Sequence, residues 1–355
     1  HLRPDKAIPS EGDVQLMVRF LLKEKTSWAE KGFEVAWEQF TLRDGLADLR
    51  NNRDTRLSEK IVASAEGDVL CIGNDNFSMQ WDMKAGTLSS LRYAEKELLA
   101  SNADLPGQFT TQAYRAPVDN DRGFGSWLAA DWEKNGMGVP VISTEETGWR
   151  RMQDNRIEIT TTKRNRYING SVLTHAVYTI SGDGSIDAAF RFIPEGELPE
   201  LPRLGIVLSL NGALENYTWY GLGPHENYRD RKESAFVGCW KSTVTDQFVN
   251  YPFPQENGNR EEIRQLTLRD DKGSGVSITA LDNSFSASAL HYLATDLVGA
   301  RHSHRLAPRA ETILSIDAIQ MGLGNSSCGP GVLTRYAVEK REQRLRFRIS
   351  GYKNR

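Results

Sequence analysis

Residues 218–231 read Thr-Trp-Tyr-Gly-Leu-Gly-Pro-His-Glu-Asn-Tyr-Arg-Asp-Arg, and residues 251–260 read Tyr-Pro-Phe-Pro-Gln-Glu-Asn-Gly-Asn-Arg. Glycine and proline interrupt the hydrogen-bond ladder that a regular strand needs. We therefore expect a large ordered loop region across both runs. Its aromatic rings supply flat apolar faces, and its amide, acidic and basic side chains supply polar ends.

This mixture of side chains suits a sugar, because a pyranose ring has one apolar face and a rim of hydroxyl groups. The candidate substrate-binding residues in the first run are Trp219, His225, Glu226 and Asn227. The alternative is a structural loop, in which arginine and glutamate side chains hold the loop's own backbone in place. The sequence leaves both interpretations open.

Two further motifs stand before and after these runs. Residues 114–123 read Tyr-Arg-Ala-Pro-Val-Asp-Asn-Asp-Arg-Gly, and residues 317–324 read Asp-Ala-Ile-Gln-Met-Gly-Leu-Gly. In this order the motifs resemble the C-terminal "small chain" domain of β-galactosidases of glycoside hydrolase family 2. The resemblance covers roughly residues 60–355 and, more weakly, the segment before them. Three long motifs in one order are far more specific than a single short pattern.

The pattern of apolar residues indicates an all-β chain. Short runs of alternating or β-branched residues, separated by turn residues, recur from Ile61 onwards and predict a large antiparallel β-sandwich. The resemblance implies, more specifically, a β-supersandwich of the galactose-mutarotase-like type. Residues 181–184, Ser-Gly-Asp-Gly, predict a hairpin turn because Asp-Gly tolerates positive φ. One helix is expected over residues 126–135, with Ser126 as its N-cap.

The predicted domain organisation has three parts. Residues 1–45 contain two alternating strands, too few for a stable sheet, and are interpreted as the C-terminal strands of an immunoglobulin-like sandwich. Residues 46–60 are charged and poor in aromatic residues, which is typical of a linker. Residues 61–355 are assigned to the small-chain supersandwich domain.

Composition excludes several classes of partner. The formal net charge is −3 with both signs interspersed, so neither nucleic acid nor a membrane surface is an expected partner. No apolar run is long enough for a transmembrane helix, and the polar opening is not a signal peptide. Cys71, Cys239 and Cys328 are too widely spaced for a metal site or a disulfide framework, and Cys71 and Cys239 are expected to be buried thiols. The compartment stays open between cytoplasm and periplasm of a bacterium.

Catalysis is expected to lie outside this chain. Glycoside hydrolysis needs two carboxylic groups flanking the scissile bond. In the resembling family both are glutamates of a separate (β/α)8 barrel, and the strand–helix alternation of a barrel is absent from these residues. The resemblance therefore implies a non-catalytic region of an enzyme that hydrolyses terminal β-D-galactosides. It implies no catalytic residue, metal site or cofactor in this chain, with any Mg or Na ions held in the barrel of a parent enzyme that is a candidate homo-oligomer.

A loop near the C-terminus carries the remaining candidate binding residues. In the family, the loop after Met-Gly-x-Gly reaches the active-site mouth and usually carries a tryptophan on which sugar stacks. The corresponding residues here are Asn325, Ser326, Ser327 and Cys328. Cys328 stands where the tryptophan would be, and a thiol offers far less stacking area than an indole. A purely structural loop is the alternative.

Other residues allow competing hypotheses. Asp119, Asn120 and Asp121 supply oxygen ligands for calcium, but a turn held by Arg115 and Arg122 is the preferred interpretation. His302 and His304 would share one face of a strand, as metal ligands, acid–base groups or structural histidines. Besides the β-galactosidase region, two functions remain: a stand-alone carbohydrate-binding module using residues 219–260, and a mutarotase-like epimerase using His302 or Glu256.

Overall fold

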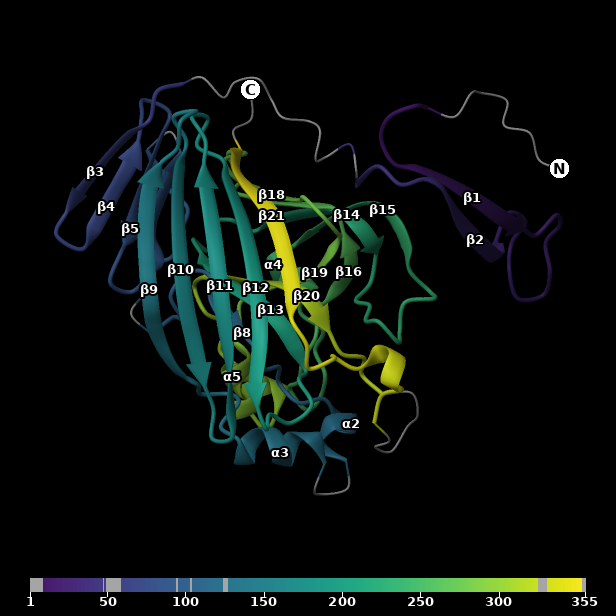
Figure 1. Cartoon of the computed structure of the whole chain (residues 1–355). Helices are drawn as coiled ribbons and strands as arrows, with labels where there is room; N and C mark the ends of the chain where they lie inside the picture. Colours follow the sequence, from purple (N-terminus) through teal and green to yellow (C-terminus); the bar gives the residue numbers. More distant parts are fainter. Residues whose placement is uncertain are drawn as a thin grey trace. The chain divides into compact units, whose positions relative to one another are not determined.

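The computed structural model describes residues 9–352, except 47, 49–58, 94, 103, 124–126 and 325–330. The chain divides into two compact units, residues 1–53 and residues 54–355. Figure 1 shows the strands of each unit. The division falls within the segment 46–60 that the sequence assigns to a linker. The predicted linker lies mostly outside the described residues.

The first unit contains an antiparallel pair, β1 (Val14–Leu21) and β2 (Glu34–Arg43). Its apolar side chains are largely exposed: Phe20 is 60% and Val35 is 55% accessible to solvent. A two-stranded sheet buries too little apolar surface to be stable alone.

The second unit is built on a nine-stranded antiparallel sheet, ordered β15-β14-β17-β18-β21-β12-β11-β10-β9. Its strands, in chain order, are β9 (Val141–Arg151), β10 (Ile157–Arg166), β11 (Gly170–Ile180), β12 (Ile186–Gly196), β14 (Asn216–Gly223), β15 (Phe236–Thr243), β17 (Gln265–Arg269), β18 (Gly275–Ala280) and β21 (Gln343–Tyr352). The predicted hairpin turn at 181–184 is confirmed, with Gly184 at φ +82° between β11 and β12.

Two smaller sheets accompany it. The first, ordered β16-β19-β20-β13-β8, contains β8 (Thr110–Gln112), β13 (Arg203–Leu210), β16 (Arg260–Ile263), β19 (Phe285–Leu290) and β20 (Thr312–Gln320). The second follows chain order through β3 (Val62–Glu66), β4 (Val69–Gly73), β5 (Phe77–Asp82), β6 (Thr87–Tyr93) and β7 (Lys96–Glu97). Every pairing in these sheets is antiparallel, which confirms the predicted all-β sandwich class.

Aromatic side chains join the three sheets into one core. Trp81 of β5 lies 4.6 Å from Tyr178 of β11, measured between ring centroids. Phe347 of β21 contacts Phe190 of the neighbouring strand at 5.7 Å and Phe285 of the smaller sheet at 6.3 Å. All five side chains are almost fully buried. Burial on this scale is the main stabilising contribution to a sandwich of this size.

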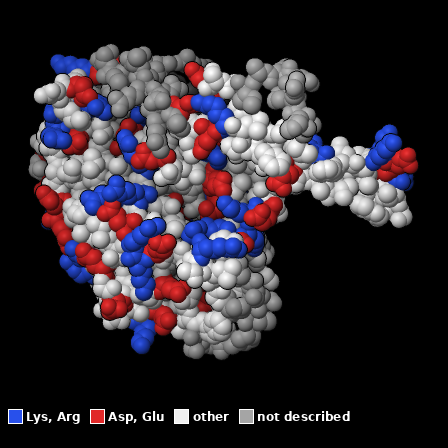
Figure 2. Space-filling model, turned by 45° about the vertical axis from the view of Figure 1, so that its right-hand side comes forward, with Lys and Arg blue, Asp and Glu red and all other residues white. Residues whose placement is uncertain are grey.

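Helices are few and short. They are α2 (Asp119–Arg122), α3 (Leu128–Lys134), α4 (Val244–Gln247) and α5 (Ala294–Gly299), with 3-10 turns η1 (Ser303–Arg305) and η2 (Thr334–Tyr336). Helix α3 lies within the predicted segment, while the expected N-cap Ser126 lies outside the described residues. None of the described helices has the length and apolar character needed to cross a bilayer. Figure 2 shows acidic and basic side chains interspersed over the face in view.

Three expectations about local structure are wrong. The first run is not wholly a loop, because β14 continues to Gly223 and pairs with β15 and β17 before the chain turns. His302 and His304 lie at η1 and not on a strand, with their exposed rings stacked at 5.5 Å. Cys239 is exposed and Cys71 is only partly buried, so neither is a core thiol.

Candidate functional site

The motifs far apart in sequence converge on four residues, Met321 to Gly324, which follow β20. Arg115 is completely buried and donates to the carbonyl oxygens of Met321 and Gly322, both at 3.0 Å. Asn120 donates to the carbonyl of Leu323 at 3.1 Å. The backbone of this segment is therefore fixed by side chains of the 114–123 motif, and we call residues 321–324 the clamped segment.

The guanidinium of Arg115 is itself held by a carboxylate. Its Nε and Nη2 donate to the two oxygens of Asp121 at 3.0 and 2.8 Å, and Asp121 also accepts from the backbone N–H of Val118. A bidentate, charge-assisted pair of this kind fixes both position and orientation. Arg115 holds the turn as expected, while Arg122 lies 3.7 Å from Asp119 and donates to the carbonyl of Pro254 at 3.3 Å. The described residues contain no cluster of three potential metal-binding side chains.

Asp230 completes the clamp from the 218–231 run. Its two carboxylate oxygens accept from the backbone N–H groups of Leu323 and Gly324, each at 2.9 Å. A Cβ at Gly322 would lie 2.4 Å from this carboxylate, so the close approach requires glycine. Three carbonyls and two amides of the clamped segment therefore have side-chain partners, while the N–H groups of Met321 and Gly322 donate to backbone carbonyls.

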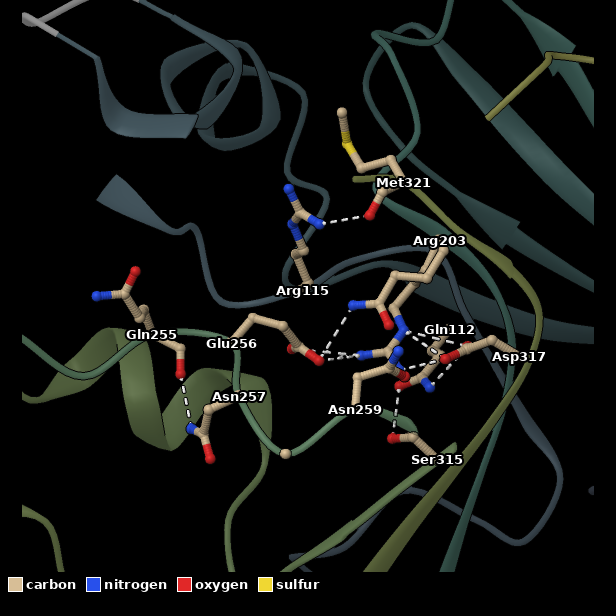
Figure 3. A network of polar contacts seen from close by, with 12 residues as sticks. Gln112, Arg115, Arg203, Gln255, Glu256, Asn257, Asn259, Ser315, Asp317 and Met321 are labelled. Carbon is tan, nitrogen blue, oxygen red and sulfur yellow. Dashed lines mark hydrogen bonds and ion pairs between the residues drawn. The ribbon is translucent and has the colours of Figure 1, made fainter. Parts of the chain in front are cut away.

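A buried ionic network lies beside the clamp (Figure 3). Arg203, at the start of β13, donates from Nε to both oxygens of Asp317 at 3.1 Å and from Nη1 to Glu256 at 3.3 and 3.4 Å. Gln320 also donates to Glu256, and Gln112 donates to Asp317. Burial alone would lower the pKa of Arg203, but the two carboxylates raise it above its ordinary value. Burial raises the pKa of Glu256.

The two polar runs are tied together chiefly by Glu226 and Asn227. Glu226 accepts from Arg231 at 2.7 Å, from the Tyr251 hydroxyl, and from the N–H of Gly258 at 2.8 Å. Asn227 is fully buried, and its side-chain oxygen accepts from the N–H of Glu261 at 2.8 Å. Both side chains therefore have the contacts expected of the structural alternative.

A cleft of about 600 Å3 brings three of the four candidate residues of this run together. Trp219, His225 and Glu226 line it, whereas Asn227 does not. The Arg260 guanidinium lies 5.1 Å from the Trp219 ring centroid, and the indole is 4% exposed. Trp219 therefore offers little free surface for a sugar to stack on. A sugar-binding role for these residues stays a prediction.

The second group of candidate residues, Asn325, Ser326, Ser327 and Cys328, lies outside the described residues. The chain enters that segment from Gly324, whose N–H is bound by Asp230.

Sequence reasoning missed Arg203, Asp230 and Gln112 as positioning residues. The sequence did carry a signal for Arg203, because this arginine opens the apolar run that forms β13. Every residue of β13 is buried. A lone arginine in such a run needs a buried carboxylate partner.

These motifs, placed around one segment, match known protein families. A family model described as "Beta galactosidase small chain" matches residues 73–349. The chain belongs to the β-galactosidase small-chain family. A second model, "Beta-galactosidase, domain 4", matches residues 2–43, which include β1 and β2.

Curated relatives of this β-galactosidase region are longer proteins. The chain is 30% identical to a β-galactosidase of Halalkalibacterium halodurans over 97% of its own length and 33% of the relative. It is 28% identical to one from Priestia megaterium, over 87% of its length and 28% of the relative. The chain thus spans about a third of the relatives it matches. Among solved structures, it is similar to a galactose 1-epimerase from Lactobacillus acidophilus, with 8% identity, a TM-score of 0.41, and coverage of 84% and 98% of the two chains.

Proposed function

We propose that this chain is the non-catalytic C-terminal region of a β-galactosidase that hydrolyses terminal β-D-galactosides. The rest of the parent chain, with its catalytic barrel, is its partner, and the parent is proposed to be a homo-oligomer. The membership of the family and the length of the relatives support this role. The described elements of the second unit are almost all strands, without the strand–helix alternation of a (β/α)8 barrel.

The clamp around residues 321–324 is the observation that carries the proposal. Three side chains from two distant motifs fix all four residues of a segment that leads directly into Asn325 to Cys328. Catalytic sites need supporting residues to be held within a fraction of an ångström. We propose that the clamp positions this loop at the mouth of the parent's active site, where it contacts β-galactoside.

Hydrolysis of a chromogenic β-galactoside tests this role. The purified 355-residue chain should give no turnover, while the parent enzyme should be active. Asp230→Asn in the parent should lower kcat/KM for the galactoside because one loop amide loses its acceptor. Asp75→Asn, at an exposed position with no hydrogen bond from its side chain among the described residues, is the matched control. Turnover by the chain alone would contradict the proposal.

An epimerase role gains no support from the arrangement of its two candidate residues. His302 is exposed beside η1, and Glu256 is buried in the ionic network with Arg203. Glu256 is therefore engaged by a permanent cation, which is unfavourable for a group that must exchange protons during ring opening.

A further inference from the structure

A second cavity, of about 240 Å3, lies on one face of the β16-β19-β20-β13-β8 sheet. It shares no lining residue with the Trp219 cleft. The register of the sheet explains its lining. Ser288 of β19 pairs with Ser315 of β20, and two residues along each strand Leu290 pairs with Ile313. Because side chains alternate between faces, these two pairs stand side by side on the cavity face.

The cavity is therefore amphipathic. Its polar end contains Ser288, Ser315, Gln112 and the ionic network around Arg203. Its apolar lining includes Leu290, Ile313, Leu297 and Met137, together with Tyr114 and Tyr292. A ligand that fits must therefore carry both hydroxyl groups and an apolar surface.

Ser288 is the polar group best placed for a ligand. It is 5% exposed and lines the cavity, yet its hydroxyl forms no hydrogen bond with any described residue. Its oxygen is not among the sealed, unpartnered oxygen and nitrogen atoms of the described core. The hydroxyl is thus available from the cavity. Opposite it, Ser315 makes only a long contact of 3.4 Å to Gln112.

The charges exclude an anionic ligand. Arg203 is the single basic side chain among the described residues that line the cavity, and its nitrogens are engaged by Asp317 and Glu256. An added anion would face the Glu256 carboxylate without a free cation. A neutral hydroxyl can donate to one serine and accept from the other, so a neutral ligand matches the polar end.

The volume limits the ligand to one ring. An apolar protein cavity of about 150 Å3 holds benzene, and pockets for drug-sized molecules begin at about 300 Å3. The volume of this cavity, about 240 Å3, lies between these two volumes. We propose that the cavity binds a neutral monosaccharide, with ring hydroxyls on Ser288 and Ser315 and the apolar face on Leu290 and Ile313. The cavity lies within this chain, so its occupancy is independent of any role beside a catalytic barrel.

Isothermal titration of the 355-residue chain with D-galactose and with D-glucose tests the site. We expect saturable binding of at least one sugar with a stoichiometry of one. Ser288→Ala should weaken binding by about twofold to tenfold, the usual effect of one neutral hydrogen bond. Ser288→Val, which also places a methyl group in the cavity, should weaken it further.

Ser286→Ala is the matched control. Ser286 lies on the same strand and is equally buried, but its hydroxyl is sealed, unpartnered and absent from the cavity lining. Its removal should leave sugar binding unchanged. Trp240→Ala, in the other cleft, should also have no effect. Absence of saturable binding, equal effects of the two serine variants, or loss of binding in Trp240→Ala would each overturn the proposal.

Discussion

Replacing Arg203 by methionine should destabilise the second unit strongly. The side chain of Arg203 is 3% exposed, and those of its partners Asp317 and Glu256 are 0% and 6% exposed. Methionine fills much of the volume but leaves two buried carboxylates without their cation. Removing one partner of a buried ion pair costs about 3–5 kcal/mol.

The contacts that remain around the two carboxylates place the expected loss of unfolding free energy near the middle of this 3–5 kcal/mol range, at about 4 kcal/mol. Two carboxylates lose a cation, which would increase the cost. However, Asp317 retains the amide of Gln112 at 3.2 Å, and Glu256 retains that of Gln320 at 3.1 Å. We therefore expect the free energy of unfolding to fall by about 4 kcal/mol at neutral pH, and less under acidic conditions, because protonation neutralises the orphaned carboxylates.

Urea denaturation followed by tryptophan fluorescence measures this loss, because Trp81 and Trp132 are fully buried in the unit. Arg191→Met is the control. Arg191 is 51% exposed in its ion pair with Glu342, and such surface pairs contribute about 0.2–1 kcal/mol.

A triple variant, Arg203→Met with Asp317→Leu and Glu256→Gln, separates charge from packing. It removes the cation and both carboxylates together, so it should regain much of the stability lost in the single variant. Our account of the network would be refuted by a single variant within 1 kcal/mol of wild type, or by a triple variant no more stable than the single one.

Three further outcomes are expected. Asp230→Asn should lower the free energy of unfolding by about 1.5–3 kcal/mol, the contribution of a hydrogen bond to a charged group, in the same urea assay. Gly322→Ala should increase the rate of proteolytic cleavage near residue 324 more than Gly299→Ala does. A Cβ at Gly322 would meet Asp230, whereas a Cβ at Gly299 would meet no atom within 4 Å. Burial raises the pKa of Glu261 from its ordinary 4.5 to about 7, so the folded state favours the protonated form. Its contribution to the free energy of unfolding is therefore full below about pH 4.5 and is lost as pH rises to about 7. Glu261→Gln should flatten this decline when the free energy of unfolding is measured across the same pH range.

The β class and the hairpin at 181–184 could be predicted because both depend on local patterns. Alternation of apolar residues and an Asp-Gly turn are visible within a few residues of sequence. The same local patterns wrongly predicted a loop at the start of the first polar run. Gly221 and Gly223 suggested a loop, but the strand is retained by its neighbours, since Tyr220 pairs with both Cys239 and Gln265. Tertiary pairing therefore overrode a local interruption signal.

The candidate site could be predicted only in part, for a related reason. The motifs were visible, but which atom of one motif binds which atom of another depends on distances between segments about 100 to 200 residues apart. Asp230 looked like one charged residue of a sugar cleft. In the structure its oxygens bind backbone amides of Leu323 and Gly324. Likewise, nothing in the sequence around Ser288 distinguishes it from Ser286.

The two polar runs contact each other, and the first of them also contacts the segment that leaves β20. Glu226 joins the first run to the N–H of Gly258, and Asn227 joins it to the N–H of Glu261. With the runs fixed to each other, Asp230 is held against the clamped segment from one side while Arg115 holds it from the other. An aromatic and charged composition that suits sugar binding is thus equally explained by positioning, because buried backbone groups outside regular structure need side-chain partners. Loss of parent activity in Asp230→Asn, with parent activity unchanged in His225→Ala of the Trp219 cleft, would assign the first run to positioning.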